Sequence, residues 1–193
     1  MKHCGGYDFP GSNSGIDHFC LTGWIPGSII FPENPDDVRD FETPAKRAWV
    51  HLYNTYSSSD CLVTVSTSKT LPDEKAEWMG LFTGHAYVVL KIVWASNGTK
   101  LLQLLKNSWA SKGWKGQFSV HDTHSWSNPA FIKEVGYDID ALATYDDGVF
   151  WMSWDDVLLY LCNIHVSWRP GFFRLRGHRH WDVNAGPKDG RTT

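Results

Sequence analysis

The spacing of apolar positions along the chain predicts short helices and short strands. Apolar residues recur at helical intervals between Ala45 and Tyr56, directly after a Thr43-Pro44 pair that suits the start of a helix. A shorter helix is expected after Ser153, because Ser153 and Asp156 fit a capping box. Runs that favour strands cover residues 61–67, 85–94, 100–106, 114–120, 148–153 and 165–171.

The runs at 85–94 and 100–106 form the clearest strand pair. Ser96-Asn97-Gly98 lies between them and is a tight-turn sequence, so the second strand should return antiparallel to the first. The sequence therefore predicts an α+β fold, with a mostly antiparallel sheet or half-barrel and a few short helices. Turn-forming residues predict irregular structure at residues 1–43, 68–83 and 121–148.

Composition and charge narrow the possible functions. The chain has 193 residues, of which 42% are hydrophobic, which is enough for one sizeable core. A formal net charge of -3 argues against a nucleic-acid-binding surface, and no apolar run approaches the length of about 20 residues that spans a membrane. Scattered His and Cys residues lack the paired spacing of a zinc site. The cysteines form no CxxC pair and no secretion signal is visible, so we expect free thiols and a cytoplasmic protein.

Candidate chemistry lies where the predicted hairpin opens. His85 begins the first strand and Asn107 follows the second, so antiparallel pairing should bring these two residues side by side. An amide oxygen there can accept a hydrogen bond from one imidazole nitrogen, which leaves the other nitrogen free to act as a general base. Trp109 is placed to shield that hydrogen bond from water. From spacing alone, a structural histidine and a turn-forming asparagine fit the same two positions.

The sequences around these residues resemble a known family. GHAYVVL at His85 and KNSWASKGWKGQF at Asn107 are similar to the His and Asn boxes of papain-fold cysteine peptidases. DDGVFWMSWDDVLLY resembles the calpain segment that follows those boxes, and GGYDFPGSNSGIDHFCLTGW resembles the start of the second calpain protease-core subdomain, as in the PalB-type branch. The resemblance implies that His85 is the catalytic base, Asn107 its orienting residue and Trp109 the shielding indole. Ser108 departs from it, because most calpains have Pro there.

The resemblance also implies a domain organisation. Residues 1–168 correspond to the His/Asn half of the calpain protease core, and residues 169–193 to the start of the β-sandwich that follows it. In calpains the nucleophilic Cys belongs to an earlier subdomain, within a Gln…Gly-x-Cys-Trp box that has no counterpart in this chain. We therefore expect part of an intracellular cysteine endopeptidase that acts on polypeptides and is inactive without its Cys-bearing subdomain. The alternative is a truncated or inactive module that binds proteins without cutting them.

Calcium is the cofactor that the resemblance raises. Calpain cores bind calcium through oxygen ligands in loops after the Asn box, and hard cations need several such oxygens. Asp147 matches one ligand position, whereas Gly113, Val120 and Val149 stand at the others and offer no side-chain oxygen. We expect that no cofactor is required and that calcium binds weakly at most.

Overall fold

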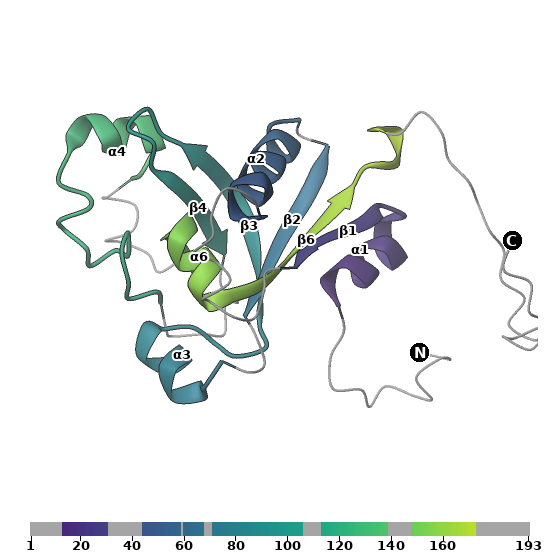
Figure 1. Cartoon of the computed structure of the whole chain (residues 1–193), viewed down its shortest axis with the longest axis horizontal. Coiled ribbons are helices and arrows are strands. Elements are labelled where there is room, and N and C mark those ends of the chain that lie inside the picture. Colours follow the sequence, from purple (N-terminus) through teal and green to yellow (C-terminus); the bar gives the residue numbers. More distant parts are fainter. Residues whose placement is uncertain are drawn as a thin grey trace, which may run out of the picture.

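One six-stranded antiparallel sheet forms the centre of the structure, with the strand order β1-β6-β2-β3-β4-β5 (Figure 1). The structure is a computed structural model that describes residues 13–30, 44–58, 60–67, 71–105, 113–138 and 148–172. The strands are β1 (Ile25–Ile30), β2 (Cys61–Thr67), β3 (Ala86–Trp94), β4 (Lys100–Leu105), β5 (Val149–Ser153) and β6 (Leu161–Trp168). The helices are α1 (Ser14–Thr22), α2 (Pro44–Ser57), α3 (Asp73–Met79), α4 (Pro129–Val135), α6 (Trp154–Tyr160) and the short 3-10 helix η3 (Pro170–Phe172). The predicted α+β class with a mostly antiparallel sheet is confirmed.

The strands β3 and β4 form the predicted antiparallel hairpin. Trp94 pairs with Lys100 next to the turn, and Val88 pairs with Leu105 at the open end. Gly98 adopts a positive φ of 88° within the turn, a conformation that glycine reaches at little cost. A β-bulge between Val89 and Lys91 shifts the pairing of β3 with β4 by one residue.

The last strand of the sheet is inserted between two earlier ones. Trp168 of β6 lies opposite Ile25 of β1 on one side and opposite Cys61 of β2 on the other. The sequence predicted a strand at residues 165–171, but β6 begins earlier, at Leu161, which pairs with Thr67 of β2. No local signal announces this start, since Leu161 directly follows the last residue of α6.

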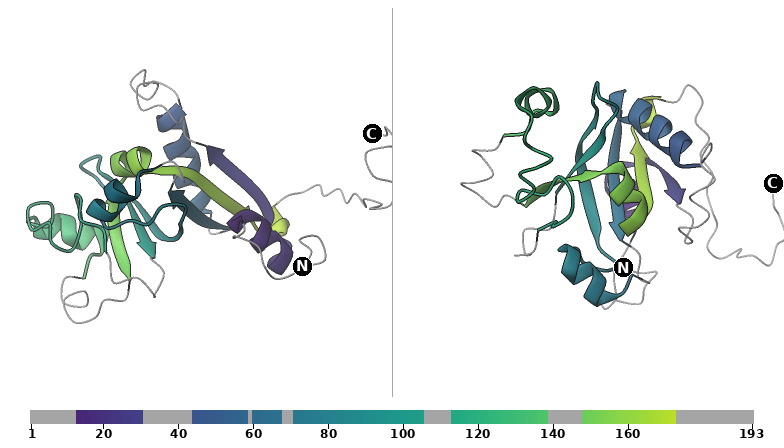
Figure 2. Two further views of the ribbon diagram at one scale, coloured as in Figure 1. Left: turned by 90° about the horizontal axis from the view of Figure 1, so that it is seen from below. Right: turned by 60° about the vertical axis from the view of Figure 1, so that its left-hand side comes forward.

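Helices pack on both faces of the sheet (Figure 2). Trp49 and Leu52 of α2 are fully buried in one hydrophobic cluster with Val65, Tyr87 and Leu104 from the sheet. Side chains alternate between faces along a strand, so Thr64 points to the face opposite Val65. The Ser14 hydroxyl of α1 lies 2.7 Å from the Thr64 hydroxyl, which places α1 on that opposite face.

Three helices occupy segments that the sequence predicted as loops. Asn13 and Asn128 cap the starts of α1 and α4 by accepting hydrogen bonds from backbone N–H groups in the first turn of each helix. Gly23, Gly80 and Gly136 end α1, α3 and α4 in the left-handed conformation. The Asn and Gly residues that we interpreted as loop formers are therefore the boundaries of short helices.

The predicted strand at 114–120 is wrong. Residues 113–115 are irregular and residues 116–121 form bends and turns, in which Phe118 has a positive φ of 63°. The Trp114 indole donates a hydrogen bond to the Gln117 carbonyl (2.8 Å), and the Phe118 N–H donates to the Asp122 carboxylate (2.9 Å). These local hydrogen bonds replace strand pairing, because the side chains satisfy the backbone groups of the turn.

Candidate active site

His85 sits at the end of a short turn, immediately before β3. Its backbone N–H donates a hydrogen bond to the Thr67 hydroxyl (3.0 Å), and its carbonyl accepts one from the Thr67 N–H (3.0 Å). The backbone of His85 thus continues the pairing of β3 with β2 by one residue. This pairing fixes the point from which the imidazole projects.

The imidazole of His85 lies between two aromatic rings. The Tyr87 ring centre is 5.0 Å from the His85 ring centre at an interplanar angle of 81°, and the Phe82 ring centre is 5.9 Å away. The Nε2 atom of His85 is buried and has no hydrogen-bond partner among the described residues. Burial lowers the pKa of His85, so the ring is neutral near pH 7 and one nitrogen can accept a proton. A buried ring nitrogen without a partner is rare in native structures and points to a missing hydrogen bond.

The other predicted site residues lie outside the described part of the chain. Asn107, Trp109 and Asp147 fall in segments that the structure does not describe, so their predicted roles stay predictions. Leu105, the last described residue of β4, pairs with Val88, which follows His85 by three positions. Thr67 and Tyr87, by contrast, contact the His85 turn and were not predicted from the sequence.

The described cysteines do not surround His85. Cys20 is exposed on α1, and the thiols of Cys61 and Cys162 donate to the carbonyls of Thr55 and Ser66, each at 3.5 Å. Burial, together with the nearby Asp60 carboxylate, raises the pKa of Cys61 to about 11. A thiol of this kind stays protonated near neutral pH and is a poor nucleophile.

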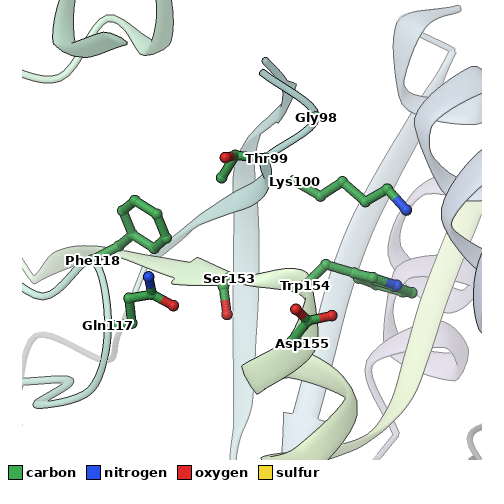
Figure 3. Close-up of a pocket in the computed structure, with 8 residues that line it drawn as sticks. All are labelled: Gly98, Thr99, Lys100, Gln117, Phe118, Ser153, Trp154 and Asp155. Carbon is green, nitrogen blue, oxygen red and sulfur yellow. The ribbon is translucent and has the colours of Figure 1, made fainter. Parts of the chain in front are cut away.

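A cavity of about 310 Å³ lies at the other end of the hairpin from His85 (Figure 3). The nine residues of β3, about 30 Å of extended chain, separate this cavity from His85. The Lys100 ammonium group is 5.5 Å from the Trp94 ring centre, and the Ser153 hydroxyl is bonded to Asp156 of α6. The cavity lining is Gly98, Thr99, Lys100, Gln117, Phe118, Ser153, Trp154 and Asp155. None of these residues forms an acid, base or nucleophile pair with His85, so we place the candidate active site at the His85 turn.

The comparison with protein families decides the identity of the fold. The family model described as calpain family cysteine protease matches residues 21–167. The chain belongs to the calpain family. The matched range includes His85, Asn107 and Trp109, and the resemblance to calpains that their motifs indicated is confirmed.

Individual calpains match this chain over nearly its whole length. Calpain-7 of Homo sapiens is 40% identical over 190 residues, which cover 97% of this chain and 22% of that protein. The calpain-like protease palB/RIM13 of Aspergillus oryzae is 34% identical over 192 residues, covering 96% of this chain and 20% of that protein. Likeness to the PalB-type branch is thereby confirmed. The chain spans about a fifth of the length of these calpains.

Weak calcium binding at most stays a prediction for this calpain. Gly113, Val120 and Val149, which the resemblance matches to ligand positions, carry no side-chain oxygen, and Asp147 is not described. Within the described ranges, no three His, Cys, Asp or Glu side chains gather in a way that could hold a metal ion.

None of the helices that the structure describes is long and apolar enough to cross a membrane.

The thiols of this calpain should differ strongly in reactivity. We expect iodoacetamide at pH 7.5 to modify exposed Cys20 first and Cys61 much more slowly, because a pKa of about 11 lowers the thiolate fraction roughly 100-fold or more below that of an ordinary thiol. Peptide mass spectrometry over a time course measures both rates. Equal rates for Cys61 and Cys20 would contradict the assignment of Cys61 as an inert structural thiol.

Proposed function

We propose that this chain supplies the general base and its orienting residue to a calpain-type cysteine endopeptidase. His85 is the base, Asn107 orients it, and Trp109 shields their hydrogen bond. The nucleophilic Cys comes from a polypeptide segment other than residues 1–193. The observation that carries the proposal is the buried, unpartnered Nε2 of His85 at the open end of the β3–β4 hairpin.

The buried Nε2 supports a hydrogen bond to Asn107. Asn107 follows Leu105 by two positions, and Leu105 pairs with Val88 close to His85. An Asn side-chain oxygen that accepts from Nε2–H satisfies the buried nitrogen and fixes the tautomer. The proton then stays on Nε2, and Nδ1 keeps the lone pair that accepts a proton.

The environment of His85 suits the first chemical step. Because burial keeps the imidazole neutral near pH 7, Nδ1 can take the proton from a cysteine thiol, which gives a thiolate and an imidazolium. The thiolate attacks the carbonyl carbon of the peptide bond. The imidazolium then returns its proton to the leaving amine as the peptide C–N bond breaks and an acyl thioester forms on the cysteine. Water hydrolyses this thioester, which releases the acyl product as a carboxylic acid and regenerates the cysteine thiol. The thiols of Cys61 and Cys162 are engaged with backbone carbonyls, which favours a nucleophile from elsewhere.

Complementation of the two halves of the protease core tests this function. Residues 1–193 are co-expressed with a calpain segment that carries the Gln…Gly-x-Cys-Trp box, and hydrolysis of a fluorogenic peptide is measured. We expect hydrolysis by the pair and none by residues 1–193 alone, because a general base without its nucleophile loses nearly all of the rate enhancement that the two produce together. His85→Ala in the pair should lower the rate by about 10³-fold or more.

The matched control is His121→Ala, which removes an exposed imidazole outside the His85 turn. It should leave the rate of the pair unchanged. Full activity of the pair with His85→Ala would overturn the role of His85. A folded, inactive wild-type pair would favour the alternative, a module that binds polypeptides without cutting them.

A further inference from the structure

The turn that carries His85 is fastened by two buried side-chain hydroxyl groups. We propose that Thr67 and Tyr87 are positioning residues for His85, which hold the turn at residues 82–85 so that the imidazole keeps Nε2 inside the protein. This inference rests on the proposed function in one respect only, namely that His85 is the catalytic base. The arrangement of the turn is independent of that function.

Thr67 joins both ends of the turn with one hydroxyl group. Its Oγ1 accepts a hydrogen bond from the His85 N–H (3.0 Å) and donates one to the Phe82 carbonyl (2.5 Å). A threonine hydroxyl has one proton to donate and two lone pairs, so these two bonds use its donor and one acceptor. Thr67 is 3% exposed, and water therefore does not compete for the hydroxyl. The Phe82 carbonyl and the His85 N–H cannot move apart without breaking at least one of these bonds.

Tyr87 holds the same turn at Phe82. Its hydroxyl accepts a hydrogen bond from the Phe82 N–H (3.0 Å), so both backbone groups of Phe82 have side-chain partners. The Tyr87 ring is 1% exposed and stands edge-on to Phe150, with 5.7 Å between the ring centres. Burial raises the pKa of Tyr87, so its hydroxyl stays protonated across the working range of a protease. These contacts fix the Tyr87 ring, whose centre lies 5.0 Å from the centre of the imidazole.

The two hydroxyl groups act on His85 through the position of its backbone. Residues 85 and 87 lie two positions apart at the start of a strand, so their side chains share one face of the sheet. A turn freed from Thr67 would let the imidazole leave this face and become hydrated. Hydration removes the burial that lowers the pKa of His85, so the pKa should rise toward its ordinary value.

The test is an NMR titration of the His85 ring in the complete chain of 193 residues. Thr67→Val keeps the shape of the side chain and deletes the hydroxyl, and we expect the pKa of His85 to rise toward its ordinary value. Thr67→Ser restores a hydroxyl and should restore the wild-type titration. The matched control is Thr64→Val, which deletes a buried hydroxyl of the same strand that is bonded to Ser14 and not to the turn. This control should titrate as wild type at His85.

Tyr87→Phe is the second variant and decides the question if Thr67→Val does not fold. It deletes the acceptor of the Phe82 N–H and should move the pKa of His85 in the same direction. A wild-type titration in both Thr67→Val and Tyr87→Phe overturns the inference, whatever the protease assay shows. Full protease activity of His85→Ala overturns the proposed function and leaves the titration result standing, so the two failures are distinguishable.

Discussion

Replacing Gly80 by alanine should destabilise the protein by about 3 kcal/mol, because two costs add at this position. Gly80 ends α3 with a φ of +77°, in the left-handed region that alanine enters only with strain. A Cβ at residue 80 would also lie 1.8 Å from the carbonyl oxygen of Gly113. The Gly113 backbone cannot move away freely, because the Lys115 N–H donates to the Met79 carbonyl close by (3.0 Å). Urea unfolding followed by tryptophan fluorescence measures the free energy of unfolding.

Gly23 provides the matched control for Gly80. It ends α1 with a φ of +71°, yet a Cβ there would meet no atom within 4 Å. Gly23→Ala therefore carries only the conformational cost, which is about 1 kcal/mol. If both variants lose the same free energy of unfolding, the close approach of Gly80 to Gly113 is not a feature of the folded protein in solution.

Replacing Trp49 by alanine should cost about 3–5 kcal/mol, which is typical of a large aromatic side chain removed from a core. Trp49 is 0% exposed, and its ring centre lies 5.2 Å from that of Trp154 and 6.1 Å from that of Tyr53. The Lys100 ammonium group is 5.6 Å from the ring centre of Trp49. Removal of the indole leaves a cavity between α2, α6 and β4. Thermal or urea unfolding of the purified variant measures the loss.

Trp49→Phe separates the packing of this ring from its polar atom. The Nε1 of Trp49 is buried and has no hydrogen-bond partner among the described residues. A phenyl ring removes this unsatisfied donor while it keeps most of the ring contacts, so the expected loss is only about 1–2 kcal/mol. A loss as large as that of Trp49→Ala would mean that the indole N–H makes a hydrogen bond in solution.

The sequence predicted best where a local signal fixes the structure. The hairpin of β3 and β4 follows from Asn97-Gly98 between two apolar runs, and α6 follows from Ser153, whose hydroxyl accepts the Asp156 N–H as a capping box predicts. Short helices were missed because their caps are also loop residues. Asn128 and Gly136 bound α4, only seven residues long, and such residues are equally frequent in turns.

Tertiary contacts explain what the sequence did not predict at the candidate site. His85 was predicted from its position at the hairpin mouth, which is a local feature, and its catalytic role stays a prediction. Thr67 contacts the His85 turn from eighteen positions away, and this contact depends on the pairing of β2 with β3. Tyr87 carries a weak signal, since it follows His85 by two positions and must share its face of the strand. Asn107 and Trp109 lie beyond the described residues, and their roles stay predictions.

The insertion of β6 between β1 and β2 sets the order in which a nascent chain can assemble this sheet. The strands β2, β3, β4 and β5 are all made before β6 and pair with one another in sequence order, so this part of the sheet can form without β6. In the described sheet β1 pairs only with β6, so Ile25–Ile30 and the preceding α1 wait for Leu161–Trp168 to emerge. Closing so long a loop is slow, so Ile25–Ile30 has no strand partner in the described sheet until β6 has been made.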